Sequence, residues 1–418
     1  MISGDNSNFT EEYESQDNSY SADSTSAVIA ALKERRNNVI CGGVNCIPFP
    51  FKHFRTEIPG IEKNQYVVVT ASQKTGKTQL TDFLYVFHAL DYVYDNRDKC
   101  SIHIIYFALE ESVERIMERY MSYLLYKLDG LRLAPIDLRS TSKDFPVPQE
   151  ALDLLESEPY QDRLKFFEEC VQFETEDTNP TGILRVCEAY AKSVGDYKTK
   201  KIKAANGKDM EIFDSYTQHD KNHYMVVIVD HIGLVDKEQG FRTKDAVDKM
   251  SEYFVKYLRN RYGFTCVAIQ QQASESEGLE AIKQKRMTPT AATLGDSKYT
   301  ARDADIVLGL FDPSKFGKAD YLGYKINALD GSGLKSYCRF INVIANRHGE
   351  MGGVCALFFD GAVCNFEELP RPDEISALDQ YYNKVKNIKS YRQQKKLKAL
   401  NAIFSLFKRK KVHLCQKK

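Results

Sequence analysis

The chain has 418 residues, 43% of them hydrophobic, and its 58 basic residues balance 58 acidic ones. This length predicts two or three domains, or one large α/β domain with appendages, and the zero net charge gives no overall field that would attract nucleic acid. Ten cysteines without a CxxC pair argue against zinc-binding and disulfide-rich classes. With neither a signal peptide nor an apolar run of about 18 residues, we expect a soluble protein of a reducing compartment, the cytoplasm, with no membrane partner.

The N-terminal segment divides into a tail and a helix. Residues 1–20 hold five acidic residues and no basic ones, with Ser and Asn between them, so residues 1–24 are predicted to be a disordered acidic tail. Residues 25–46 are predicted to contain a helix with Val28, Ile29 and Leu32 on one face. That face either meets another subunit or packs on the chain's own domain.

A phosphate-binding loop is predicted at "TASQKTGKTQL", residues 70–80. A β-branched run precedes it and a helical pattern follows it, which is the strand–loop–helix context that this motif requires. Gly76 allows the tight turn, Lys77 supplies a positive charge to the β- and γ-phosphates, and the Thr78 hydroxyl is a ligand for Mg²⁺. The alternative is a chance "GKT" at a helix start. The remaining residues of the predicted loop are Ala71, which stands where glycine is usual, and Ser72, Gln73, Lys74 and Thr75.

Two further strands are predicted to end in carboxylates. The strand in "CSIHIIYFALEES" (100–112) ends at Glu110 and Glu111, and a helix follows. A carboxylate at this edge of a parallel sheet, beside a phosphate loop, is placed to polarise a water for attack on the γ-phosphate. The alternative is a charge that complements the dipole at the helix N-terminus, which fits Glu111 better than Glu110 and leaves both roles open for Glu110. The strand in "HYMVVIVDHIGLV" (223–235) ends at Asp230, which matches a Walker B aspartate that holds the Mg²⁺ shell.

The rest of the chain completes an alternating pattern. The strand in "FTCVAIQQQ" (264–272) ends in glutamines, and strands are also predicted in 304–311 and 339–349. Gln271 is either a sensor of the γ-phosphate or a solvent-facing amide. Strands that alternate with helices predict an α/β fold with a mostly parallel twisted sheet and helices on both faces. The stretches 196–222 and 312–337 are interpreted as polar insertions, and 371–418 as a basic helical tail.

In this order, the motifs resemble the ATPase domain of the DnaB-like replicative helicases, the superfamily 4 ring helicases with a RecA-like P-loop NTPase core. The resemblance covers roughly residues 25–367, with an ATPase domain over 47–370 and a linker helix over 25–46. Family loops of the form A-R-P-S-M-G-K-T also begin with alanine, as Ala71 does here. The family's S-L-E-M places its catalytic glutamate at Glu110, its I-D-Y-L-Q-L-M places the Walker B residue at Asp230, and its S-Q-L-S-R places the sensor at Gln271.

Two later segments extend the resemblance. The stretch "KRMTPTAATLGDSKYTARDAD" (285–305) matches a family motif at Pro289, Leu294, Ser297, Asp303, Ala304 and Asp305. The family's A-K-Q-R-N-G resembles "ANRHG", which makes Arg347 the counterpart of the arginine finger. Three features depart from the pattern. Ser274 stands where arginine is usual, Ala345 stands where the family has lysine, and only about 50 residues precede the domain, so the helical collar is expected to be missing.

The resemblance implies an ATP- and Mg²⁺-dependent hexameric helicase that moves 5′→3′ on single-stranded DNA and unwinds duplexes at a replication fork. The catalytic residues implied are Glu110, Gln271 and Arg347. Pore loops would supply the DNA contacts, and their candidate residues are Lys285, Arg286, Gly295, Asp296 and Lys298. The compact chain suggests a viral or mobile-element replisome, hence a host cytoplasm, while a loader or primase partner is left unnamed.

Two other functions stay open. A RecA-type recombinase or accessory DNA-dependent ATPase would use the same site without unwinding DNA. A non-catalytic DNA-binding scaffold would carry a vestigial site. The resemblance of residues 25–46 to a linker helix argues against the first, and the presence of Lys77, Thr78, Glu110 and Asp230 together argues against the second.

Overall fold

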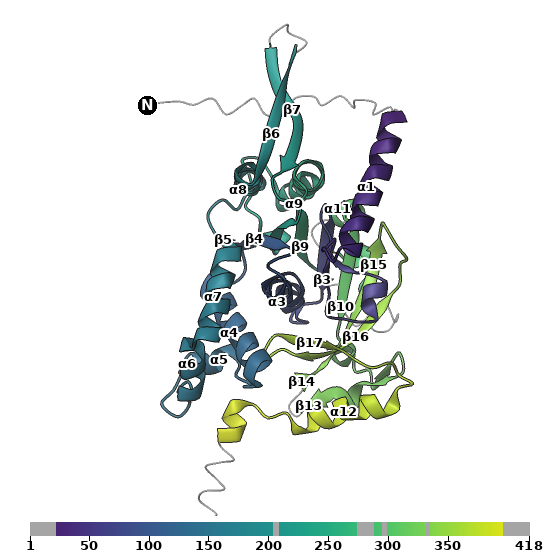
Figure 1. Ribbon diagram of the computed structural model, residues 1–418. Coiled ribbons are helices and arrows are strands. Elements are labelled where there is room, and N and C mark those ends of the chain that lie inside the picture. Colours follow the sequence, from purple (N-terminus) through teal and green to yellow (C-terminus); the bar gives the residue numbers. More distant parts are fainter. Residues whose placement is uncertain (1–21, 204–208, 274–287, 295–298, 332–334, 396–418) are drawn as a thin grey trace, which may run out of the picture. The chain divides into compact units, whose positions relative to one another are not determined.

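A computed structural model describes residues 22–203, 209–273, 288–294, 299–331 and 335–395 (Figure 1). The chain divides into two compact units, Met1–Asn45 and Cys46–Lys418. The described part of the first unit consists of one helix, α1 (Ala22–Ile40), and the turn after it, where Asn38 Nδ2 donates to Asn45 Oδ1 at 2.7 Å. The apolar side chains of Val28, Ile29 and Leu32 on α1 are exposed.

A nine-stranded mixed sheet forms the centre of the second unit, in the order β17-β16-β15-β10-β3-β9-β8-β4-β5. The strands from β10 to β5 are parallel to one another, whereas β15, β16 and β17 add an antiparallel edge. The predicted α/β class with a mostly parallel sheet is therefore confirmed. The strands are β3 (Tyr66–Ala71), β4 (Ser101–Ala108), β5 (Val171–Glu174), β8 (His223–Asp230), β9 (Thr265–Gln271), β10 (Ile306–Phe311), β15 (Cys338–Asn346), β16 (Val354–Asp360) and β17 (Asn365–Glu368).

Register brings the ends of the central strands to one edge. Ala71 at the end of β3 pairs with Gln271 of β9, and Ala108 at the end of β4 pairs with Asp230 of β8. Because parallel strands point the same way, the loops that follow β3, β4, β8 and β9 all leave from this carboxyl edge. The sheet therefore gathers the predicted phosphate loop, Glu110, Asp230 and Gln271 on a single side.

Helices cover both faces of the parallel part, because its strands are apolar on both sides. Tyr66, Met225 and Cys266 belong to a core cluster on the face that three helical segments cover: α8 (Pro180–Ser193), α9 (Thr243–Tyr253) and a π-helical continuation of α9 (Phe254–Tyr262). The other face is covered by three helices. One is continuous and consists of α2 (Lys77–Thr81), a π-helical turn (Asp82–Phe87) and α3 (His88–Asp95). The others are α4 (Val113–Asp129) and α7 (Glu158–Cys170). The short helices α5 (Pro135–Leu138) and α6 (Gln149–Glu156) lie between α4 and α7 in the chain, and β1 (Ile47–Pro48) pairs with β2 (Gly60–Ile61) ahead of the sheet.

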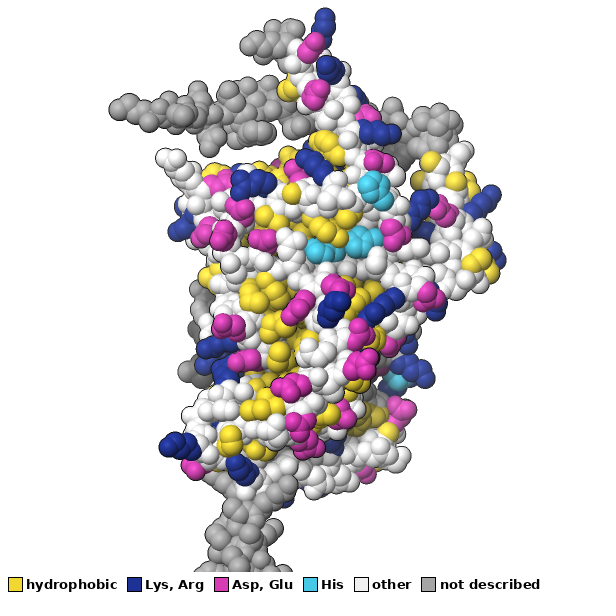
Figure 2. Space-filling model, turned by 60° about the vertical axis from the view of Figure 1, so that its left-hand side comes forward, with side chains coloured by type: hydrophobic (Ala, Val, Ile, Leu, Met, Phe, Trp, Pro, Cys, Tyr) yellow, Lys and Arg dark blue, Asp and Glu magenta, His cyan; other side chains and the backbone are white. Residues whose placement is uncertain are grey.

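The first predicted insertion, 196–222, forms a long hairpin of β6 (Gly195–Lys203) and β7 (Asp209–Gln218) that projects from the second unit (Figure 1). Its strands carry both signs of charge, as in the 3.5 Å pair of Lys200 Nζ with Asp214 Oδ1. Figure 2 shows the molecule turned by 60° from the view of Figure 1, with basic and acidic side chains interspersed over the face that it presents. The described part of the hairpin is therefore a mixed-charge surface rather than a basic arm.

The second predicted insertion, 312–337, is less polar than its sequence suggested. Tyr324, Ile326 and Leu329 are buried in a second core cluster on the antiparallel edge of the sheet.

Helix α12 (Ile375–Asn387), in the predicted C-terminal tail, buries Leu378 and Val385 in the same cluster, so it packs on the sheet. The amphipathic part of the predicted basic tail, which includes Leu397 and Phe407, lies outside the described residues. The small strands of the second insertion are β11 (Asp320–Tyr321), β12 (Tyr324–Lys325), β13 (Asp330–Gly331) and β14 (Lys335–Ser336), and the short helix α11 (Tyr299–Asp303) lies ahead of β10. None of the helices in the described ranges is long and apolar enough to cross a membrane.

Candidate nucleotide site

The predicted phosphate loop has the backbone of an anion-binding turn. It leaves the end of β3 at Ala71, passes through Lys74 at φ +54° and Gly76 at φ +105°, and enters the helix at Lys77. A side chain at Gly76 would be strained at this φ, and its Cβ would lie 3.1 Å from the Phe359 ring. The loop therefore ends directly at a helix N-terminus, where free N–H groups favour negative charge.

Lys77 and Glu110 face each other across the loop. The Lys77 Nζ lies 3.8 Å from Glu110 Oε2, with the lysine side chain 10% exposed and the glutamate 49% exposed. The segment after β4 is held in place because the N–H groups of Leu109 and Glu110 both donate to the carbonyl of Asp230, at 2.9 and 3.2 Å. A carboxylate thus stands at the open side of the loop, within reach of water.

Thr78 and Asp230 form the second pair of the site. Thr78 Oγ1 donates to Asp230 Oδ1 at 3.4 Å, and the aspartate is only 3% exposed. Burial, and then the nearby Asp82, raise the pKa of Asp230 from 3.8 to about 7, while Thr78 and Lys77 act in the opposite direction. The folded protein therefore favours the protonated form between about pH 4 and pH 7. A divalent cation beside this carboxylate would offset the cost of its burial.

The donor set fits Mg²⁺ rather than a metal held by protein alone. Three or more His, Cys, Asp or Glu side chains do not gather into a metal-holding group in the ranges that the structure describes. Mg²⁺ is usually bound by one or two protein oxygens together with substrate phosphates and water. Thr78 Oγ1 and Asp230 Oδ1 supply two such oxygens at the mouth of the loop.

A buried network behind the site separates the two adjacent glutamates. Arg119 Nη1 donates to Asp82 Oδ2 at 2.9 Å, and the same guanidinium forms an ion pair with Glu111. Tyr106 donates to Asp82 at 3.0 Å and lies 3.4 Å from Asp230 Oδ2. Burial raises the pKa of Asp82 to about 6, although Arg119 and Tyr106 lower it. Glu111 is thus committed to an internal ion pair, whereas Glu110 faces the loop.

The glutamine run at the end of β9 contributes a residue that sequence reasoning missed. Gln271 is the register partner of Ala71, as expected for a residue at the carboxyl edge. The next residue, Gln272, is 5% exposed and accepts a 3.4 Å hydrogen bond from Ser72 Oγ in the loop. The period-2 alternation of a strand puts neighbouring residues on opposite faces, so Gln271 and Gln272 differ in what they can contact. In the sequence, the run of three glutamines carries no signal that tells Gln272 from Gln271 as the residue that contacts the loop.

Arg347 lies at the opposite edge of the sheet from the loop. It follows β15, whose Asn346 pairs with Ile306 at the start of β10. Its Nη2 donates to the carbonyl of Arg302 at 3.1 Å, and its Nε lies 3.4 Å from the buried Asp305 carboxylate. Six residues of β3 span about 20 Å between the two edges. Arg347 therefore does not join Lys77 and Glu110 within one chain.

Comparison with known proteins gives matches among solved structures, whereas no family model and no curated protein matches the sequence. One match is a DnaB-like replicative helicase described with its interactions with primase, at 12% identity and a TM-score of 0.55. It pairs 82% of this chain with 65% of that chain, so this chain spans just under two thirds of the helicase. Another is a structure described as an ATPase domain, at 13% identity and a TM-score of 0.55, where 83% of this chain pairs with 98% of that one. The fold is that of RecA-like ATPase domains. At this identity the likeness concerns the fold alone.

The candidate DNA contacts of this RecA-like fold lie outside the described residues. Lys285 and Arg286 belong to 274–287, and Gly295, Asp296 and Lys298 belong to 295–298. The described residues next to them include Ala273, Leu294, which forms a β-bridge with Gln272, and Tyr299, where α11 begins.

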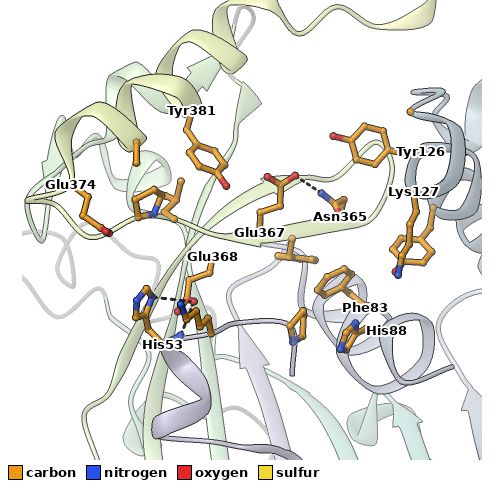
Figure 3. A pocket seen from close by; sticks show the side chains of 18 residues that line it. His53, Phe83, His88, Tyr126, Lys127, Asn365, Glu367, Glu368, Glu374 and Tyr381 are labelled. Atoms are coloured by element: carbon orange, nitrogen blue, oxygen red, sulfur yellow. Dashed lines mark hydrogen bonds and ion pairs between the residues drawn. The ribbon is translucent and has the colours of Figure 1, made fainter. Parts of the chain in front are cut away.

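A cavity of about 930 Å³ lies away from the phosphate loop, between α12, β17 and the C-terminal half of α4 (Figure 3). Its two β17 carboxylates are engaged internally. Glu367 pairs with Lys384 at 2.8 Å, and Glu368 accepts from the backbone N–H groups of His53 and Phe54 at 2.8 and 3.0 Å. Size alone therefore does not make this cavity the reactive site. The candidate reactive groups gather instead at the phosphate loop, where Lys77 lies 3.8 Å from Glu110 and Thr78 lies 3.4 Å from Asp230.

Proposed function

We propose that this chain is an ATP-driven, DnaB-like replicative DNA helicase that works as a ring of identical subunits. One observation carries the ATPase part of the proposal. Lys77 lies 3.8 Å from Glu110, Thr78 lies 3.4 Å from Asp230, and both pairs stand at the mouth of a phosphate-type loop. A structural ion pair would explain the first contact alone, and a structural hydrogen bond the second. Neither would explain why a lysine, a hydroxyl and two carboxylates meet at one helix N-terminus.

Each side chain has a defined task in this proposal. The amides of residues 72–78 and the Lys77 ammonium bind the β- and γ-phosphates, and the Thr78 hydroxyl and the Asp230 carboxylate hold Mg²⁺. When bound, Mg²⁺ neutralises charge on the phosphate oxygens. ATP would draw Lys77 away from Glu110, which leaves that carboxylate free to orient a water and take its proton. Gln271, at the neighbouring strand end, would respond to the γ-phosphate.

The position of Arg347 supports a site shared between subunits. An arginine finger must reach the γ-phosphate, and within one chain about 20 Å of sheet separates Arg347 from the loop. A neighbouring copy that presents its Arg347 edge to the phosphate-loop edge would supply the missing cation, and repetition of that contact closes a ring. We propose a hexamer. The exposed face of Val28, Ile29 and Leu32 on α1 would then pack on the adjacent subunit as a linker.

Mixing two inactive variants tests this arrangement. Arg347→Ala subunits keep an intact loop, and Lys77→Ala subunits keep an intact finger. Mixtures with an excess of Lys77→Ala are expected to regain part of the ATPase rate, because some interfaces then pair a wild-type loop with a wild-type finger. Steady-state ATPase assays across mixing ratios measure the recovery. Arg302→Ala, which removes a neighbouring exposed arginine side chain, is the matched control and should retain activity without mixing.

Two results would count against the shared site. Failure of complementation at every ratio would favour a site within one chain, or a ring so strictly coordinated that one defective subunit stops it. Sedimentation then decides between them. A protein that stays monomeric at micromolar concentration with ATP and Mg²⁺ has no ring, and the proposal of a hexamer would be withdrawn.

The nucleic-acid part of the proposal rests on the likeness of fold to DnaB-like helicases and on the motif order. Single-stranded DNA would pass along the segments that hold Lys285, Arg286, Gly295, Asp296 and Lys298, without reading base sequence. Stimulation of the ATPase by single-stranded DNA tests this step. A rate that rises equally with mixed-sequence oligonucleotides supports it, and a rate that ignores DNA at low salt would leave an ATPase with another partner.

A further inference from the structure

A short segment outside the predicted site reaches the phosphate loop. The 3₁₀ turn Pro313–Phe316 follows β10, whose Leu310 is the register partner of Ala71 at the end of β3. The loops after these two adjacent parallel strands therefore leave the sheet side by side. The Asp312 side chain caps the turn by accepting from the Ser314 N–H at 3.1 Å and its hydroxyl at 2.9 Å.

Lys315 extends from this turn onto the loop. Its Nζ donates to the carbonyl oxygen of Gln73 and to Thr75 Oγ1, the latter at 3.0 Å. Lys315 is exposed, yet its ammonium bonds two residues of the loop at once. Hydrogen bonds from a charged donor are roughly twice as strong as neutral ones. A lysine that served only as a hydrated surface charge would not bond two loop residues at once.

A second cation holds the same part of the loop from the protein interior. Arg339 on β15 donates from Nε to the carbonyl of Thr75 at 2.8 Å, and its Nη1 lies 3.0 Å from Asp312 Oδ2. Asp312 therefore links the arginine to the turn that carries Lys315. Between them, Lys315 and Arg339 engage two carbonyl oxygens and a hydroxyl in the outer half of the loop.

We propose that Lys315 is a positioning residue for nucleotide binding, which acts by fixing the Gln73–Thr75 half of the phosphate loop. This rests on the proposed ATPase function. Lys74, between the two anchored residues, has φ +54°, a left-handed backbone that persists in a non-glycine residue only when its surroundings impose it. With its carbonyls held by Lys315 at the surface and by Arg339 in the interior, the loop enters the phosphate complex already ordered, so binding loses less conformational entropy. The same ammonium adds positive charge beside the triphosphate.

The test compares three variants of the full chain: Lys315→Met, Lys315→Arg and the control Lys318→Met. Lys318 lies one turn further along and stacks over Tyr321 at 5.6 Å instead of touching the loop. Titration with a fluorescent ATP analogue and Mg²⁺ should show the dissociation constant of Lys315→Met raised about tenfold, the low end of the range for lost charge-assisted hydrogen bonds, because Lys315 is exposed. Lys315→Arg should restore most of the affinity, and Lys318→Met should match wild type. Melting temperatures should agree among all four proteins.

Hydrogen exchange in the nucleotide-free protein gives a second readout that needs no ATP. The peptide covering residues 70–80 should exchange faster in Lys315→Met than in wild type or Lys318→Met. If wild type binds ATP and Lys315→Met binds equally well with unchanged exchange, the positioning role is wrong while the ATPase proposal stands. If wild type binds no ATP, the ATPase proposal itself fails, whatever the exchange rates.

Discussion

Replacing Lys77 with alanine is expected to abolish ATP hydrolysis, with the rate falling at least about a hundredfold. In the proposed function this ammonium binds the β- and γ-phosphates, and removal of one pre-placed group that stabilises developing charge costs about 10²–10³ in rate. The lysine is almost buried at the start of α2, with its side chain 10% exposed, so alanine leaves that position without a charge. Steady-state phosphate release with Mg²⁺ and saturating ATP measures the effect.

Lys99→Ala is the matched control for this variant. Lys99 follows the far end of the helix that Lys77 begins, and its Nζ donates to Asn96 Oδ1 at 3.1 Å in an exposed position. Its removal should leave the rate within about twofold of wild type. Retention of more than about a tenth of the wild-type rate in Lys77→Ala would place the hydrolytic site elsewhere.

Glu110→Gln is expected to lower turnover by about 10²–10⁴ while leaving ATP binding and assembly intact. The amide keeps the size and the hydrogen-bonding reach of the carboxylate but cannot take a proton from water. It also removes the charge that faces Lys77 at 3.8 Å, so the affinity for ATP should hold or rise slightly. Single-turnover hydrolysis, set against equilibrium binding of ATP, separates the chemical step from binding.

The adjacent Glu111→Gln supplies the comparison. Glu111 forms an ion pair with Arg119, which also holds Asp82 at 2.9 Å, so this change should lower thermal stability more than it lowers turnover. If Glu111→Gln stalls hydrolysis while Glu110→Gln does not, the assignment of the base is off by one residue.

The sheet and its reactive edge could be predicted from local patterns. The run Tyr66–Val69 is fully buried, so both faces of β3 had to be apolar and the stretch indicated a buried parallel strand. Carboxylates directly after such runs, as at Asp230, must fall on the carboxyl edge whichever way the strands are ordered. Fold class and the convergence of Lys77, Glu110 and Asp230 therefore follow from periodicity and strand direction.

Contacts that join distant parts of the chain could not be predicted from such patterns. Lys315 lies in a stretch that was interpreted as a polar insertion, and its contact with Gln73 depends on β10 being the neighbour of β3. The buried Arg339 donates to the carbonyl of Thr75, and the local pattern of its strand does not indicate this partner. The same holds for β16, which pairs antiparallel with β15, and for β17, which pairs antiparallel with β16 and extends the sheet beyond the predicted strands. Strand order is set by long-range packing, and a local window does not contain it.

Unwinding of a forked DNA duplex tests the central claim most directly. The forked substrate carries one labelled strand and two single-stranded tails, a 5′ tail on one strand and a 3′ tail on the other. Two companion substrates each keep one of these tails, either the 5′ tail or the 3′ tail. A ring helicase of the proposed kind should release the labelled strand with ATP and Mg²⁺ only when the 5′ tail is present, and Lys77→Ala should release none. ATP hydrolysis without strand release from any of these substrates would contradict the helicase proposal and favour a RecA-type or accessory ATPase.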